Sequence, residues 1–125
     1  MAAAHMTTDQ VAKKLVELCK QNKAMEAVQT LYSADVVSKE ATPTPDGISE
    51  MKGLDAKVGK MQWWESNHDI HSATVEGPLS AASHFSVRFT YDMTFKPTGK
   101  RATMDELGVY QVKDGKIVRE EYFYA

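Results

Sequence analysis

Several features that direct proteins to a particular environment or partner are scarce or missing in this chain of 125 residues. It has one cysteine, Cys19, so no disulfide can form within the chain and no oxidising compartment is required. No apolar run approaches the ~18 residues that a membrane span needs. The formal net charge is only -2, which gives no electrostatic signature of nucleic-acid binding. We therefore expect a cytoplasmic protein that binds neither membrane nor nucleic acid.

The composition is that of an ordinary globular protein. Hydrophobic residues make up 42% and charged residues 26% of the chain, which argues against disorder. At ~100–200 residues per domain, the length predicts one domain. Residues 1–6 lack the basic and apolar regions of a signal peptide and resemble a cloning tag or an alternative start. We therefore assign the single domain to residues 7–125.

Apolar residues with helical spacing dominate the first half of the chain. Val11, Leu15 and Leu18 recur every three or four residues behind a cap at Thr7 or Thr8, which predicts a first helix. The other elements expected in this half are a short helix over 25–32, a strand over 35–40, a loop over 41–47 and a helix that opens at 52–55 and ends at Trp63 and Trp64.

From residue 68 onward the hydrophobic period changes to two. Residues 84–95 alternate strictly, with Phe85, Val87, Phe89 and Tyr91 on one side. The other predicted strands cover 68–77, 101–112 and 116–124, with turns at Pro78, 97–100 and Asp114-Gly115. Helices followed by antiparallel strands linked through hairpins predict an α+β fold.

Three local phrases carry a family resemblance. They are Thr94-Phe-Lys-Pro-Thr-Gly-Lys100, Met104-Asp-Glu-Leu-Gly-Val-Tyr110 and Lys113-Asp-Gly-Lys-Ile-Val-Arg-Glu-Glu121. With the order of elements, they resemble the nuclear transport factor 2-like superfamily and, within it, the SnoaL-like polyketide cyclase and ketosteroid isomerase group. This resemblance implies a cone-shaped α+β barrel, in which three N-terminal helices pack on a long curved antiparallel sheet and the concave face forms a pocket.

The ketosteroid isomerase pattern, aligned with this chain by its turns, implies roles for three positions. The family's general-base aspartate falls on Glu40, which is also acidic. The family's two oxyanion donors, a tyrosine of the first helix and a protonated acid, fall on Leu15 and near Gly108. Neither side chain can donate a hydrogen bond. Because an enolate needs such donors, steroid isomerase activity is not expected.

Glu106 is the strongest catalytic candidate. The family pattern places it on the concave face beside Met104 and Tyr110, where loss of solvent raises the carboxyl pKa and yields a usable acid or base at neutral pH. Two alternatives are that Glu106 points outward and that a neighbouring Arg or Lys neutralises it. Glu40 is the second catalytic candidate, and its alternative is an exposed charge paired with Lys39.

The candidate ligand-binding residues are mostly aromatic side chains expected at the pocket. They are Tyr32, Trp63, His71, Phe89, Tyr91, Met104, Tyr110, Glu120, Tyr122 and Tyr124. A metal site is not expected, because His68 and Asp69 face opposite sides of a strand, as do Asp69 and His71, whereas a metal needs three or four converging ligands. No glycine-rich phosphate loop occurs, so we expect no cofactor.

The convex face of the sheet carries a separate prediction. Leu107, Val109, Ile117 and Phe123 fall on this face when the family pattern is applied. An apolar face on so small a protein does not stay in water, so we expect a twofold homodimer that covers it, as the resemblance also implies.

Three functions are compatible with these observations. The first is an acid–base isomerase, cyclase or hydrolase that acts on an apolar compound through Glu106 and Glu40. The second is a non-catalytic module that binds a hydrophobic ligand. The third is an interaction protein whose cone is filled by its own side chains, and the pocket volume distinguishes it from the other two.

Overall fold

The computed structural model describes residues 5–43 and 47–125, which form three helices and one six-stranded sheet. The elements are α1 (Thr8–Lys20), α2 (Ala24–Leu31), β1 (Tyr32–Lys39), β2 (Glu50–Lys52), α3 (Leu54–Asn67), β3 (His68–Ala81), β4 (His84–Phe95), β5 (Lys100–Lys113) and β6 (Lys116–Phe123). The strand order is β2-β1-β6-β5-β4-β3, and only the β1–β6 pair is parallel. The predicted α+β fold with a curved sheet is confirmed, and the sheet does not close.

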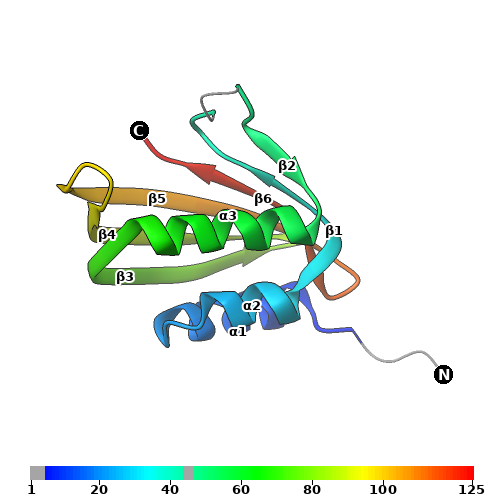
Figure 1. Ribbon diagram of the computed structural model, residues 1–125. Coiled ribbons are helices and arrows are strands. Elements are labelled where there is room, and N and C mark those ends of the chain that lie inside the picture. The colour runs from blue at the N-terminus through cyan, green and yellow to red at the C-terminus, as the bar shows by residue number, and fades with distance from the viewer. Residues whose placement is uncertain (1–4, 44–46) are drawn as a thin grey trace.

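The helices cover one side of this sheet (Figure 1). Helix α1 begins where the sequence predicts, because Thr7 and Gln10 form a reciprocal capping box. It packs on α2 and against β3 and β4, while α3 lies in front of the sheet in Figure 1, roughly along its long strands, and contacts β1. The core joins the apolar faces of α1 and α2 to the concave residues of β4, β5 and β6. Its strand side includes Phe85, Val87 and Tyr110, all at most 1% exposed.

Strand β3 is longer than the sequence predicts. The expected turn at Pro78 is wrong, because β3 continues to Ala81. Its register against β4 shifts between Glu76 and Leu79, and Gly77 between them adopts a positive φ of 130°. Because β3 is an edge strand, a proline can interrupt its ladder at such a bulge without ending the strand. The short strand β2, which pairs with β1, has no counterpart in the sequence prediction.

A second irregularity changes the face of one residue. Ile117 does not lie on the convex side as expected, because it is fully buried in the core. The β5–β6 register shifts beyond Gln111, so that Val112 pairs with Ile117, and this extra residue reverses the alternation. Leu107 and Phe123 are 41% and 49% exposed. Coverage of that face by a second copy of the chain stays a prediction.

No helix within residues 5–43 and 47–125 combines the length and apolar character that crossing a bilayer requires.

Candidate functional site

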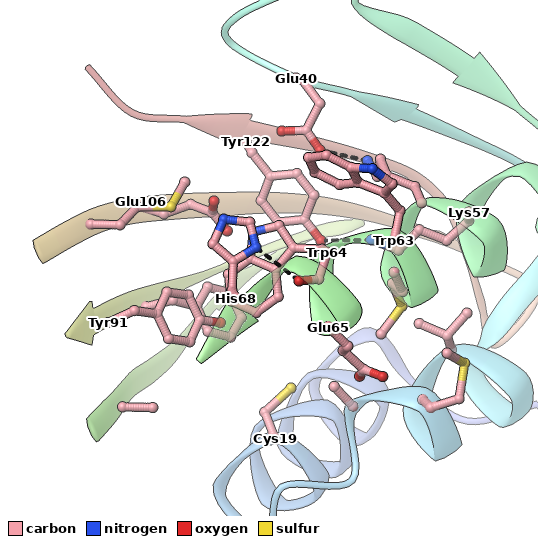
Figure 2. A pocket seen from close by; sticks show the side chains of 18 of the residues that line it. Cys19, Glu40, Lys57, Trp63, Trp64, Glu65, His68, Tyr91, Glu106 and Tyr122 are labelled. Carbon is pink, nitrogen blue, oxygen red and sulfur yellow. Dashed lines mark hydrogen bonds and ion pairs between the residues drawn. The ribbon is translucent and has the colours of Figure 1, made fainter. Parts of the chain in front are cut away.

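A pocket of about 1050 Å³ lies between the helices and the concave face of the sheet. Its presence overturns the third sequence hypothesis, in which the cone is filled by its own side chains. The predicted site residues that line it are Tyr32, Glu40, Trp63, Phe89, Tyr91, Met104, Glu106, Tyr110, Tyr122 and Tyr124. Figure 2 shows Glu106, Tyr91 and Tyr122 projecting from the sheet toward Trp63 and Trp64 of α3. The structure thus brings together residues from every part of the chain.

Two predicted ligand-binding residues lie outside this lining. The ring of His71 is exposed, and its Nε2 lies 2.7 Å from Oγ1 of Thr94. The β3–β4 register shifts between Ile70 and Ser72, so His71 lies at a bulge and does not share the face of the pocket residues of β3. Glu120 is fully buried behind the pocket wall, where its carboxylate forms hydrogen bonds and an ion pair with other residues of the protein.

Glu106 lies in the apolar part of the pocket. On the sheet it pairs with Phe89, and Tyr91 and Met104 form the next pair on the same face. Loss of solvent raises the pKa of its carboxyl group to about 7, and the negative charge of Glu40 adds to this effect. Lys57 and Lys60 oppose the shift without cancelling it. Glu106 belongs to the pocket lining, so the side chain points inward (Figure 2).

Glu40 follows β1 at the pocket rim and has a different partner from the one the sequence suggested. Lys60 of α3, rather than Lys39, lies 2.5 Å from its carboxylate. The hydroxyl of Tyr124 donates to the other carboxylate oxygen at 3.0 Å. Lys39 instead faces Glu121 at 4.0 Å. The second catalytic candidate is therefore held in place by one ammonium and one phenol.

Glu120 is the centre of a buried network. Its carboxylate accepts hydrogen bonds from Ser38 at 2.7 Å, from Tyr122 at 2.7 Å and from Tyr32, and Lys57 forms an ion pair with it at 2.5 Å. Burial opposes ionisation of Glu120, but Lys57 and the hydroxyl donors outweigh burial and lower its pKa. This glutamate therefore joins α3 to β1 and β6 and is not free to bind a ligand.

The network also determines which tyrosine hydroxyls can reach a ligand. Tyr32 and Tyr122 donate to Glu120, and Tyr124 donates to Glu40. The ring of Tyr110 is folded over Gly108, where a Cβ atom would come within 2.7 Å of the hydroxyl oxygen. Burial raises the pKa of the Tyr91 hydroxyl, and no hydrogen bond contributes to that shift. Tyr91 is thus the pocket tyrosine best placed to donate to a ligand.

His68 is a pocket residue that the sequence interpretation did not select. Its Nδ1 lies 2.8 Å from the carbonyl oxygen of Trp64. A carbonyl only accepts, so Nδ1 carries the proton and Nε2 of the neutral ring has the free lone pair. The imidazole stacks on Trp64 at a centroid distance of 4.6 Å (Figure 2). The sequence feature that could have identified His68 as a pocket residue is its position directly after the third predicted helix.

Lys57 and Lys60 also line the pocket and were not selected. They are three residues apart on α3, so both face the sheet, and this spacing was visible in the sequence. Cys19 lies in the same lining, where burial raises its thiol pKa to about 11 and makes it a poor nucleophile at neutral pH. Among the described residues, no three His, Cys, Asp or Glu side chains converge to hold a metal.

Comparisons with known proteins agree with this architecture. A family model described as a SnoaL-like domain matches residues 6–124. A Mesorhizobium loti protein assigned as a SnoaL-like polyketide cyclase (carbohydrate phosphatase) is 41% identical, with a TM-score of 0.90 over 95% of this chain and 100% of the other. No curated protein matches the sequence.

More distant structures share the fold alone. A Bacillus subtilis protein assigned as an isomerase is 18% identical, with a TM-score of 0.74 over 96% of this chain and 90% of the other. A nuclear transport factor 2-like protein from Burkholderia thailandensis is 17% identical, with a TM-score of 0.80 over 96% and 92%.

Proposed function

The chain belongs to the SnoaL-like domain family, and we propose that it is an acid–base enzyme, an isomerase, cyclase or hydrolase, that acts on an apolar small molecule bound in its pocket. The observation that carries this proposal is the carboxyl group of Glu106, which lies in an otherwise apolar wall and has a pKa of about 7. A group with such a pKa is present in both protonation states at neutral pH, so it can take up or release a proton during a reaction.

The neighbouring groups support proton transfer at a carbon next to a carbonyl group. Glu106 takes the proton, and the charge that develops on the carbonyl oxygen needs a hydrogen-bond donor. The hydroxyl of Tyr91 is the donor we propose. Glu40 is the second carboxylate of the acid–base pair, and its contacts with Lys60 and Tyr124 hold it at the rim.

The apolar part of the pocket supports the choice of substrate class. Phe89 and Tyr91 stack with nearly parallel rings at 6.1 Å, and Trp64 packs against Tyr91 at 5.4 Å. Such surfaces bind flat, apolar rings through contact area and ring stacking. We therefore propose an apolar carbonyl compound with at least one ring as the substrate.

A test of this function follows deuterium incorporation from D₂O into 2-tetralone, an apolar bicyclic ketone, by proton NMR at pD 7.4. We expect the protein to accelerate exchange of the protons next to the carbonyl. Glu106→Gln lowers the acceleration by at least about 100-fold, the scale of a lost general base. Glu76→Gln changes an exposed glutamate outside the pocket and leaves the rate unchanged. Equal exchange by wild type and Glu106→Gln contradicts the proposal.

A non-catalytic ligand-binding module is the second candidate, and one specific observation favours it. The positions at which related isomerases place oxyanion donors are Leu15, which is buried, and Gly108, whose space is filled by the Tyr110 ring. Saturable binding of 2-tetralone without accelerated exchange supports this alternative.

A further inference from the structure

We propose that Lys60 is a nucleophilic amine that forms an imine with an apolar ketone or aldehyde bound in the pocket. This activity uses the same cavity as the proposed function but does not require Glu106. It assigns covalent chemistry to a residue whose other contacts connect α3 to Ser38 of β1, to Glu40 after β1 and to the Tyr122 ring of β6.

The position of the amine is the first support. Lys60 lines the pocket, and its side chain is 17% exposed, so Nζ is accessible from the cavity but mostly shielded from bulk water. Nζ donates to Oγ of Ser38 at 2.6 Å and to the Glu40 carboxylate at 2.5 Å. These two contacts fix the amine at the pocket wall, as reaction with a bound carbonyl group requires.

The charges around Lys60 are the second support. Burial lowers its pKa, and the positive charge of Lys57, one turn earlier on α3, lowers it further, although Glu40 and Glu120 act in the opposite direction. A lysine in an apolar pocket beside a second cation is one of the arrangements that make an amine nucleophilic near neutral pH. Lys57 itself is 5% exposed and bound to Glu120 and Tyr122, so its amine is not available.

Lys60, Glu40 and the carbonyl compound supply every proton and electron pair that the reaction needs. Glu40 removes one proton from the Lys60 ammonium, and the nitrogen lone pair attacks the carbonyl carbon while the C=O π electrons move to oxygen. A second proton passes from nitrogen to that oxygen and gives a carbinolamine. Glu40 then returns its proton to the hydroxyl group, which leaves as water as the nitrogen lone pair forms the C=N bond. The products are a protonated imine and one water molecule, and Glu40 is regenerated.

Reductive trapping tests the proposal without knowledge of the natural ligand. Wild-type protein is incubated with 2-undecanone and sodium cyanoborohydride at pH 7.5, and intact and fragment masses are measured. Hydride reduces the imine to a stable secondary amine, which adds the mass of the ketone less one oxygen atom. We expect one adduct, on Lys60, formed at least about tenfold faster than on any other lysine, because exposed lysines are almost fully protonated at this pH.

Matched variants and probes complete the experiment. Lys60→Arg keeps the positive charge and loses the adduct, whereas Lys39→Arg, outside the pocket, keeps it. Glu76→Gln, at an exposed glutamate outside the pocket, also keeps the adduct. The adduct is detected by its mass, so failure of the proposed acid–base function does not remove this result. Acetone, which has no apolar chain, gives no selective labelling. The absence of an adduct, or adducts spread over surface lysines, overturns the proposal, and fragment masses of wild type decide this even if Lys60→Arg does not fold.

Discussion

Glu106 of β5 and Glu120 of β6 lie on neighbouring strands. Both are shielded from solvent, but their carboxyl pKa values shift in opposite directions. Glu120 has Lys57 and three hydroxyl donors around it, and these contacts lower its pKa in spite of burial. Burial and the charge of Glu40 raise the pKa of Glu106 to about 7. The comparison teaches that burial alone does not create a reactive acid. What distinguishes Glu106 is burial without compensating donors.

The largest effect is expected where the compensated glutamate is changed. Glu120→Gln removes the negative charge opposite Lys57 and leaves a buried ammonium without a counter-ion. We expect a loss of about 3–5 kcal/mol in the free energy of unfolding, measured by urea denaturation at pH 7.5. A loss below about 1 kcal/mol contradicts the role of Glu120 as the centre of the network.

Glu106→Gln is expected to raise the free energy of unfolding, whereas Glu120→Gln lowers it. The folded-state pKa of Glu106, about 7, exceeds its ordinary value of 4.5. Its protonated form therefore stabilises the fold fully below pH 4.5, and this contribution is lost as the pH rises through 7. At about 1.4 kcal/mol per pH unit, with a discount for partial exposure, the loss is about 2–3 kcal/mol.

Glu106→Gln removes this penalty. We expect the variant to exceed wild type in unfolding free energy by about 2–3 kcal/mol at pH 8 and to equal it at pH 4.5, in parallel urea titrations. A constant difference across this pH range would show that the titration of Glu106 does not contribute.

A smaller difference in stability is expected between Tyr32→Phe and Tyr91→Phe, because the two hydroxyls have different partners. Tyr32→Phe removes a hydroxyl that donates to Glu120, and we expect a cost of about 1–2 kcal/mol in thermal or urea unfolding. Tyr91→Phe is the control, because no hydrogen bond contributes to the pKa shift of that hydroxyl, and its cost is expected below about 0.5 kcal/mol. Equal costs contradict the distinction drawn between the two hydroxyls.

The last prediction concerns the reactivity of a thiol, with no change in stability expected. Burial raises the thiol pKa of Cys19 from 9.0 to about 11, so its thiolate fraction at pH 8 falls about 100-fold. Alkylation by iodoacetamide is therefore expected to be about two orders of magnitude slower in the folded protein than in urea. Similar rates in both states contradict this prediction.

The half of this comparison that concerns Glu106 was implied by the family resemblance, whereas the residues of 101–112 alone leave its face open, because both faces of that strand contain apolar residues. Residues 84–95 alternate so strictly that the face of β4 is unambiguous, and β5 pairs with it without a register shift from Lys100 to Gln111. Glu106 therefore lies where the family pattern places it. The order of most helices and strands was predictable because the hydrophobic period is helical in α1 and is two in β4.

The other half could not be predicted, because it depends on contacts between distant segments. Glu120 was expected to face a ligand, and nothing local indicates that Ser38 and Lys57 converge on it. Ile117 was placed on the wrong face because a bulge reverses the alternation within a single strand. Bulges and long-range ion pairs arise from tertiary packing, which period and propensity do not describe.

Carboxyl ¹³C chemical shifts across a pH titration test the central claim most directly. Glutamate labelled at the side-chain carboxyl carbon is incorporated, and Glu106→Gln and Glu120→Gln assign the two resonances. We predict that the Glu106 resonance titrates with a midpoint near pH 7 and that the Glu120 resonance shows no transition between pH 5 and pH 8. A Glu106 midpoint near 4.5, the ordinary value for a solvated carboxyl, would contradict the account of Glu106 as the acid–base group of this pocket.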